Sequence, residues 1–190
     1  MYIDVPAMRF LTVRGNGAPQ GEAYQRALQT LYGVTFAIKM SAKTGCVLPG
    51  YVPYKAPPLE GLWWCEGGGL DRHAPKETWE WISLMRQPDF VTPEVFAWAL
   101  ETCRTKRKRT DLCEIELQTI EEGPCVQCLH AGTYETEHET IARMHEFMRR
   151  QGLQDDSGAV RKHHEIYLSD PRRSAPEKWK TLLRLPVRAK

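Results

Sequence analysis

One order of predicted elements occurs twice along this chain of 190 residues. The order strand, helix, strand, strand runs over Met8–Gln87 and again over Cys125–Arg188, and a glycine, Gly15 or Gly132, breaks each leading strand. Neither half is long enough to bury a large share of its own surface. We therefore predict a single domain over residues 1–190, in which the strands of both halves join one sheet.

The strands are predicted from alternation of apolar and polar residues, and the helices from apolar positions at helical spacing. One helix is predicted over Gln20–Met40 and another over Glu137–Gln151, where Gly152 ends it. The strands predicted, in order, are Met8–Arg14, Leu59–Glu66, Trp79–Gln87, Glu114–Ile120, Cys125–Ala131, His163–Ser169 and Thr181–Arg188. The fold class is therefore α+β: a duplicated strand–helix–strand–strand module, with an antiparallel sheet, helices on one side and a ligand crevice between the pseudo-symmetric halves.

A connecting segment over about 92–120 separates the repeats of about 8–87 and 125–188. Its helix should begin with Thr92 as N-cap and Pro93 at the first position. Apolar stripes predict which residues of the two later helices are buried. The residues predicted to be buried are Phe96, Ala99, Leu100 and Cys103 in the connecting helix, and Ile141, Met144, His145 and Met148 in the helix of the second copy. The spacing of Ser174 and Glu177 is that of a capping box and predicts a short helical turn.

Charge and cysteine content favour a cytoplasmic protein. The net charge is only +2, and the basic run Arg104–Arg109 lies where a helix ends, a position that favours solvated cations. We therefore expect no direct binding of nucleic acid. No apolar segment has the length of a membrane span or signal peptide, so no membrane contact is expected. The six cysteines lack the spacing of a disulfide framework, and the sequence does not predict an oligomeric state.

No metal site and no cofactor are predicted. Cys125 and Cys128 form a CxxC pattern, but residues three apart on a strand point to opposite faces. The adjacent residues His163 and His164 also point apart on their strand. These residues are therefore better interpreted as structural than as ligands of a shared ion.

Aromatic residues gather in the first copy, where four of the six tryptophans lie in two predicted strands. A long proline-rich loop over Ser41–Pro58 adds Tyr51 and Tyr54 and could cover a crevice. For any single tryptophan, packing in the core is the better-supported alternative. The concentration of aromatic residues in one half favours some of them, Trp63 in particular, as the lining of a cavity.

Glu165 is out of place in the middle of a predicted strand, because carboxylates are depleted from strands. It shares a face with His163 and Tyr167. On a solvated face Glu165 would be an ordinary surface carboxylate. On a crevice face it could bind a cation beside aromatic rings, or act in proton transfer with a pKa raised by burial.

Several segments together resemble the GyrI-like small-molecule-binding family, whose fold also occurs in the effector-binding domains of multidrug-responsive regulators. The segments are Arg14–Gly17, Leu59–Trp64, Met85–Thr92, His164–Pro171 and Ala175–Lys178. The resemblance covers nearly the whole chain and implies a ligand crevice reached by a strand glutamate, which maps onto Glu165. Stand-alone members include hydrolases that open strained cyclopropane rings of DNA-alkylating natural products, with a pocket Glu and a supporting Tyr. Tyr134 matches that tyrosine. The chain lacks the helix-turn-helix of the regulators, so a direct transcriptional role is not expected.

Two functions of different classes remain open. The first is a hydrolase of cyclopropanoid or similar reactive xenobiotics, in which Glu165 and Tyr134 are catalytic. The second is a non-catalytic protein that binds or sequesters hydrophobic, often cationic, compounds. In both cases the ligand is an aromatic or lipophilic small molecule. The residues predicted to bind it are Trp63, Tyr51, Tyr54, Tyr167 and His130.

Overall fold

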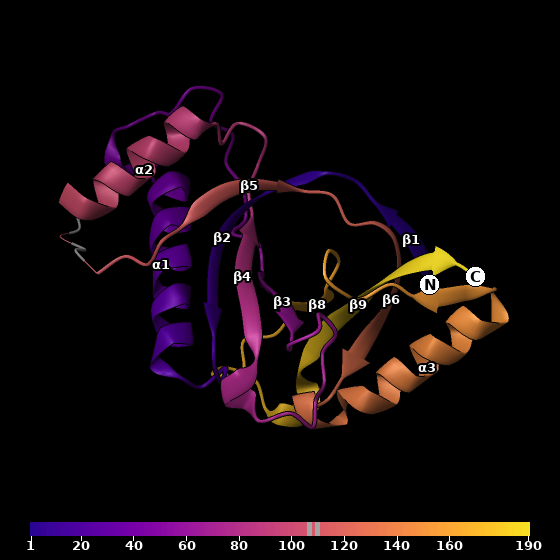
Figure 1. Ribbon diagram of the computed structural model, residues 1–190. Helices are drawn as coiled ribbons and strands as arrows, with labels where there is room; N and C mark the ends of the chain where they lie inside the picture. Colours follow the sequence, from indigo (N-terminus) through magenta and orange to yellow (C-terminus); the bar gives the residue numbers. More distant parts are fainter. Residues whose placement is uncertain (106–107, 109–110) are drawn as a thin grey trace.

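The structure, a computed structural model, describes residues 1–105, 108 and 111–190. This part of the chain contains three α-helices and nine strands, and the antiparallel sheet is strongly curled (Figure 1). The helices are α1 (Glu22–Lys39), α2 (Pro93–Thr105) and α3 (Glu137–Arg150). The strands are β1 (Tyr2–Val5), β2 (Met8–Asn16), β3 (Leu59–Trp64), β4 (Glu80–Arg86), β5 (Glu116–Ile120), β6 (Gly123–Ala131), β7 (Leu153–Asp155), β8 (His163–Tyr167) and β9 (Lys180–Ala189). The predicted mixture of helices with an antiparallel sheet is confirmed.

The strands follow the order β1-β6-β9-β8-β3-β4-β2-β5, with β7 paired to β9 outside this path. All neighbours pair antiparallel, and the middle of the sheet is the pair β3–β8, one strand from each half of the chain. In this pair Gly61 lies opposite Glu165. The strand that carries Glu165 is therefore a central strand.

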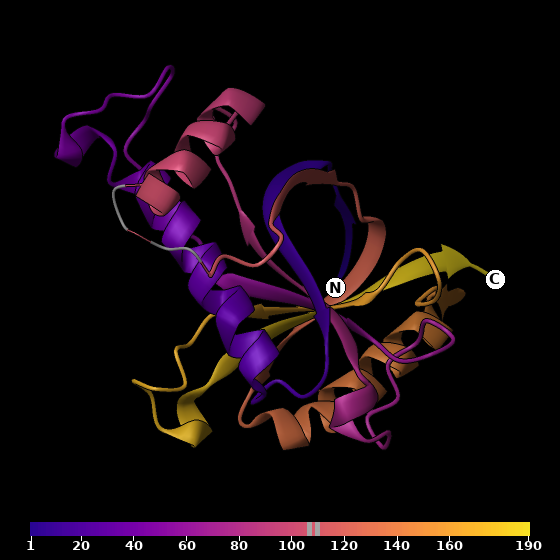
Figure 2. The same ribbon diagram turned by 60° about the vertical axis from the view of Figure 1, so that its left-hand side comes forward.

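Helices α1 and α3 cover the same face of the sheet on either side of this central pair. Helix α1 packs over β2 and β4, and α3 packs over β6 and β7 (Figures 1 and 2). Cross-strand partners share a face. Glu165 is paired with Leu183, which packs in the core under α3, and its strand neighbour His163 is paired with Trp63 in the core under α1. The side chain of Glu165 thus lies between the two helices.

Three apolar clusters hold this arrangement together. The largest joins α1 and α2 to β2, β3 and β4, and includes Leu31, Ile38 and Trp81. The second joins α3 to β6 and β9 through residues such as Met144 and Leu183. The third lies on the opposite face of the sheet, inside the curl. Its buried members are Phe10, Leu62, Trp64 and Leu84.

Most helix predictions agree with the structure, with one clear error. The backbone N–H of Val95 donates to Thr92 Oγ1 at 3.4 Å, so Thr92 caps α2 as predicted. Met144 and Met148 are buried in α3, but His145 is exposed and pairs with Asp155 at 3.0 Å. The prediction that His145 is buried was wrong, because its position lies beside the buried stripe of Met144 and Met148, and its imidazole pairs with Asp155 instead.

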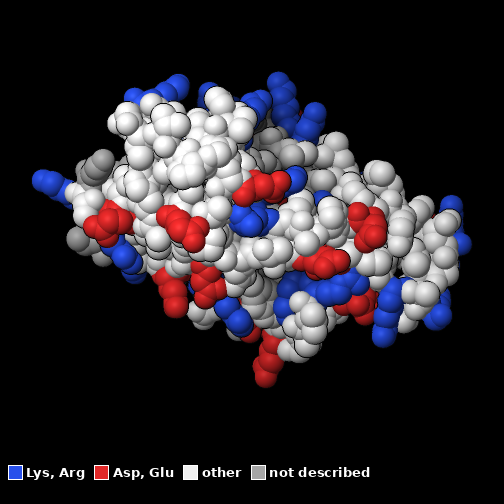
Figure 3. All heavy atoms as spheres, turned by 90° about the horizontal axis from the view of Figure 1, so that it is seen from above, with Lys and Arg blue, Asp and Glu red and all other residues white. Residues whose placement is uncertain are grey.

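Acidic and basic side chains are interspersed over the face of the molecule seen in Figure 3. The basic run predicted at the end of the connecting helix begins with Arg104, in the last turn of α2, and positions 106, 107 and 109 lie outside the described residues. None of the helices in the described part of the chain combines the length and the apolar composition that a bilayer crossing requires.

Candidate functional site

Glu165 lies at the centre of a buried network of polar side chains. Only 7% of this residue is exposed. Its Oε1 accepts from Arg72 Nη2 at 3.0 Å and lies 3.0 Å from His163 Nε2, and its Oε2 accepts from the hydroxyl of Tyr167 at 2.9 Å. Strand alternation places His163, Glu165 and Tyr167 on the same face. Glu165 is therefore a satisfied, buried carboxylate, and a surface role is excluded.

These partners determine the protonation state of Glu165. Burial is the largest single influence and raises the pKa of its carboxyl group, but the hydrogen bond and charge of His163, the charge of Arg72 and the hydrogen bond from Tyr167 together outweigh burial. The pKa of Glu165 is consequently held well below its usual range. The sequence-based expectation of a raised pKa was wrong, because it took account of burial and could not foresee three donors around one carboxylate.

Tyr167 links Glu165 to the aromatic core of the first half. Its hydroxyl accepts from Trp63 Nε1 at 2.8 Å while donating to Glu165. This chain of bonds passes over Gly61, where a Cβ atom would lie 2.5 Å from Trp63 Nε1. A glycine at this position is thus required for close approach. Gly15, in the first segment of the family resemblance, has a similar role, because a Cβ there would lie 2.3 Å from the ring of Trp81.

Two charged residues of the network were not found from the sequence. Arg72 comes from the loop between β3 and β4, and its Nη2 donates to Glu137 Oε2 at 2.6 Å as well as to Glu165. Glu137 is the first residue of α3, and its side chain is fully buried. Burial, followed by the charge of Glu165, raises the pKa of Glu137 well above its usual range, although Arg72 acts in the opposite direction. The two carboxyl groups that share Arg72 therefore differ in pKa, which is raised at Glu137 and lowered at Glu165.

Tyr134 lies in the short turn before α3 and packs edge-on against Tyr167, with 6.0 Å between the ring centres. It also contacts Trp179 at 5.1 Å. Burial and then the negative charge of Glu165 raise the pKa of Tyr134 to about 12. Its hydroxyl therefore remains protonated near neutral pH and can act as a donor close to the carboxylate.

The other predicted ligand-binding residues lie in different surroundings. The rings of Tyr51 and Tyr54 both pack on Phe90, and the hydroxyl of Tyr51 donates to the carbonyl of Lys39 at the end of α1. His130 is buried on β6. Its two ring nitrogens contact Thr140 Oγ1 at 3.0 Å and the Thr133 carbonyl at 2.9 Å, which fixes the turn that carries Tyr134. Of the residues predicted from the sequence, Glu165, Tyr167 and Trp63 are thus joined by hydrogen bonds, and Tyr134 packs beside them.

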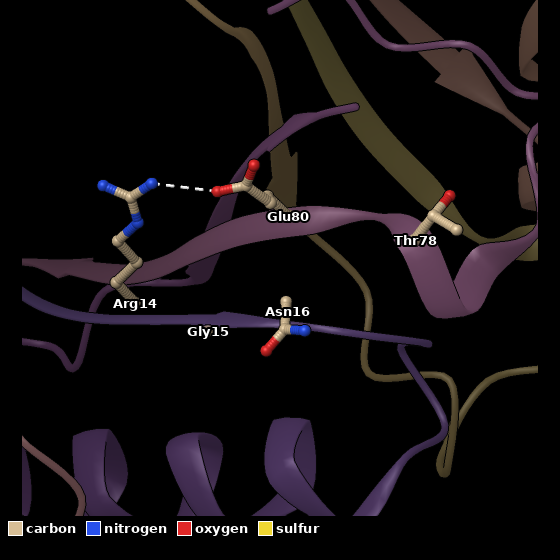
Figure 4. Close-up of a pocket in the computed structure, with 5 residues that line it drawn as sticks. All are labelled: Arg14, Gly15, Asn16, Thr78 and Glu80. Carbon is tan, nitrogen blue, oxygen red and sulfur yellow. Dashed lines mark hydrogen bonds and ion pairs between the residues drawn. The ribbon is translucent and has the colours of Figure 1, made fainter. Parts of the chain in front are cut away.

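An open hollow of about 470 Å³ lies elsewhere on the molecule, lined by Arg14, Gly15, Asn16, Thr78 and Glu80. Arg14 of β2 and Glu80 of β4 form an ion pair of 2.9 Å across it (Figure 4). The Arg14 side chain is largely exposed to solvent and that of Glu80 partly so, and Arg14 also stacks on Trp64 at 5.3 Å. At Glu165, by contrast, both carboxylate oxygens have buried partners: Arg72 and His163 contact Oε1, and Tyr167 contacts Oε2.

A second ionic cluster lies on the opposite face of β8, around His164. Its Nε2 lies 3.0 Å from Glu60 Oε2, its Nδ1 lies 2.9 Å from Glu122 Oε2, and Arg184 pairs with the other oxygen of Glu122. The adjacent histidines therefore face different partners, as strand alternation predicts. Burial alone would lower the pKa of His164, but its bonds to Glu122 and Glu60 raise it to about 9.

Comparisons with known proteins place this architecture in a family. Residues 85–188 match the GyrI-like small molecule binding domain. The chain belongs to this family. A search of curated proteins gives no significant match to this GyrI-like chain.

Solved structures extend the likeness beyond the matched residues. A protein from Listeria innocua described as a hydrolase is 48% identical to this GyrI-like chain, with a TM-score of 0.90 over 99% of this chain and 91% of the other. An uncharacterized conserved protein from Listeria innocua is 50% identical, with a TM-score of 0.94 over the same shares. The EcmrR C-terminal domain, at 11% identity and a TM-score of 0.58, covers 100% of this chain and 97% of its own, and shares the fold alone.

Proposed function

We propose that this GyrI-like protein binds lipophilic aromatic small molecules at Glu165 and hydrolyses reactive cyclopropane-bearing or similar electrophiles, as a cytoplasmic detoxification enzyme. The observation that carries the proposal is the buried carboxylate of Glu165, hydrogen-bonded to Tyr167, against whose ring Tyr134 packs edge-on. The hydrolase description of the Listeria innocua protein at 48% identity also supports it. The six free cysteines support the cytoplasm as its compartment.

The chemistry requires a base, a donor and a dry pocket. Glu165 would take a proton from a water molecule as the water oxygen attacks a carbon of the strained ring. The carbon–carbon bond of the ring would break, and its electron pair would move to the electron-withdrawing group of the substrate. The hydroxyl of Tyr134 would donate a hydrogen bond to the charge that develops there. The aromatic rings of Trp63 and Tyr167 would hold the flat part of the ligand.

The order of strands supports the duplicated module that this proposal needs. The first half contributes β2-β4-β3 and the second contributes β6-β9-β8, so each leading strand pairs with the last strand of its own half. A helix follows each leading strand. We infer that the halves are copies that meet at β3–β8, with the crevice between α1 and α3. Superposition of the two halves with Trp63 matched to Glu165 tests this inference.

The second candidate is a protein that binds hydrophobic cations without turning them over. The aromatic network around a negative charge favours it, since cations are attracted both to ring faces and to carboxylates. In that case Glu165 is a counter-charge and Tyr134 is only part of the wall.

Single-turnover hydrolysis of a cyclopropane-bearing alkylator, with affinity measured separately, distinguishes the two candidates. Glu165→Gln keeps the shape of the side chain and removes the base. For a hydrolase, this variant should lose roughly 10²–10⁴-fold in rate with little change in affinity for the neutral substrate. Glu80→Gln makes the same change at a partly exposed carboxylate at the start of β4 and should keep full rate. Full activity of Glu165→Gln would exclude Glu165 as the base.

A further inference from the structure

Arg72 places a positive charge against the two carboxyl groups of the candidate site. Its side chain reaches from the loop between β3 and β4 to α3 and β8, where one nitrogen, Nη2, lies 2.6 Å from Glu137 Oε2 and 3.0 Å from Glu165 Oε1. The same nitrogen lies 3.4 Å from His163 Nε2. The positive charge of Arg72 therefore occupies the place that a cationic ligand of Glu165 would need.

The loop that carries Arg72 is held in this position by its own bonds. The backbone N–H of Cys65 donates to the Gly69 carbonyl at 2.7 Å, and Asp71 Oδ1 accepts from the backbone N–H of His73 at 2.8 Å. Trp79, which closes the loop, packs edge-on against Trp63 at 5.9 Å. Arg72 is thus presented by an anchored segment that packs on the aromatic wall of the site.

The carboxyl groups around Arg72 already have partners without a ligand. Arg72 pairs with Glu137 at 2.6 Å and with Glu165 at 3.0 Å, and His163 Nε2 lies 3.0 Å from the same oxygen of Glu165. A second cation would either displace Arg72 from two buried acceptors or lie beside a like charge. Both outcomes disfavour cationic ligands.

Two buried atoms of the same side chains remain available to a neutral polar ligand. Arg72 Nε has no hydrogen-bond acceptor and Glu137 Oε1 no partner among the described residues. A ligand oxygen could accept from Arg72 Nε, whereas a hydrocarbon would leave this donor unpaired.

We propose that Arg72 determines ligand specificity at this site: it selects neutral aromatic compounds that carry a carbonyl or similar oxygen acceptor and excludes aromatic cations. This inference rests on the proposed binding of small aromatic molecules at Glu165, and it names their charge and polar group. It does not depend on turnover. Arg72 is a specificity-determining residue, whereas the base remains Glu165.

The test uses three naphthalene probes of similar size: neutral 2-acetylnaphthalene, neutral 2-tert-butylnaphthalene and cationic N,N,N-trimethyl-2-naphthylammonium. Their affinities for the full chain are measured by equilibrium dialysis. The wild-type protein should bind the acetyl compound at least about tenfold more tightly than the cation, and more tightly than the tert-butyl compound. Arg72→Met, which removes the charge and keeps much of the stem, should raise affinity for the cation at least about tenfold and weaken binding of the acetyl compound.

Two further variants test whether the change in affinity depends on the positive charge of Arg72. Arg72→Lys keeps the positive charge and should still exclude the cation, which also covers the case that Arg72→Met folds poorly. Arg14→Met removes an exposed arginine of the other hollow and should leave all three affinities unchanged. An unaltered order of affinities in Arg72→Met, wild-type preference for the cation, or binding of no probe would each overturn the proposal. If the protein hydrolyses the substrate but lacks this selectivity, the inference about Arg72 is wrong and the proposed enzyme stands. If it shows the selectivity but no hydrolysis, the proposed enzyme is wrong and the inference about Arg72 stands.

Discussion

Gly61 and Tyr167 lie so close that a Cβ atom on Gly61 would be 3.0 Å from the tyrosine hydroxyl. The hydroxyl cannot retreat freely, because it joins Trp63 Nε1 to Glu165 Oε2. The absence of a side chain at Gly61 is therefore what allows an aromatic hydrogen-bond chain to cross the two central strands. The first prediction follows from this contact.

Gly61→Ala should destabilise the protein by about 1–3 kcal/mol, the usual scale of overpacking, since the added methyl group displaces Trp63 or Tyr167. Urea unfolding followed by tryptophan fluorescence measures the change. Gly69→Ala is the matched control, because a Cβ there meets nothing within 4 Å. Equal stability of the two variants would show that the chain of bonds is looser than the structure has it.

Tyr167→Phe and Tyr134→Phe should separate a structural hydroxyl from a functional one. Loss of the Tyr167 hydroxyl leaves Trp63 Nε1 and one oxygen of Glu165 without a partner, and should reduce the free energy of unfolding by roughly 1–3 kcal/mol. Tyr134 contributes ring contacts that phenylalanine keeps, so its variant should change stability by less than about 0.5 kcal/mol. If the proposed hydrolysis is correct, Tyr134→Phe should still slow single turnover. The reverse order of destabilisation would contradict the assignment.

The low pKa of Glu165 predicts an activity that survives mild acid. An ordinary glutamate, with a pKa of about 4.3, would be mostly protonated at about pH 4 and would lose most of its activity as a base. Glu165 is held ionised by His163, Arg72 and Tyr167, so the single-turnover rate should be nearly constant between about pH 7 and pH 4. In Tyr167→Phe one donor is lost, and the acidic limb should move to higher pH. A wild-type limb above about pH 4.5 would count against this account, provided that circular dichroism shows the protein folded there.

The sequence alone predicted the helices and strands that are marked by a local pattern of residues. Alternation located the long strands, and Thr92 marked the start of α2 to the residue. It was insufficient for β1 and β7, which are four and three residues long and are stabilised by pairing with β6 and β9. Strands as short as these show too few alternations to be distinguished from loops.

Two members of the network around Glu165 could not be predicted from the sequence. Glu165 itself could be singled out because a carboxylate in a central strand is unusual. Glu137 occupies the first turn of α3, where an acidic residue is normal on account of the helix dipole, and Arg72 lies in a loop rich in glycine. Their importance comes from tertiary contacts between segments 65 residues apart. The available signal was the glycine-rich loop that follows two tryptophans. It indicates that the loop backbone packs closely on another segment, but it does not single out Arg72.

The raised pKa of His164 predicts that the folded protein loses stability in mild alkali. Its pKa is about 9 in the folded protein, because Glu122 and Glu60 favour the charged ring, and about 6.5 in an unfolded chain. A raised pKa stabilises the fold fully below about pH 6.5, and this contribution disappears as the pH rises through about 9. The difference corresponds to roughly 3 kcal/mol, at about 1.4 kcal/mol per tenfold change in proton affinity. Urea unfolding between pH 6 and pH 9.5 should show this decline.

His164→Gln should be less stable than the wild type at pH 6, because it leaves Glu60 without the cation it pairs with and Glu122 with Arg184 alone. Its stability should vary much less between pH 6 and pH 9.5, since the group responsible for the change is gone. His138→Gln removes an exposed histidine at the start of α3 and should keep the wild-type slope. The same slope in His164→Gln would mean that another group titrates in this range and that His164 is not the source of the pH dependence.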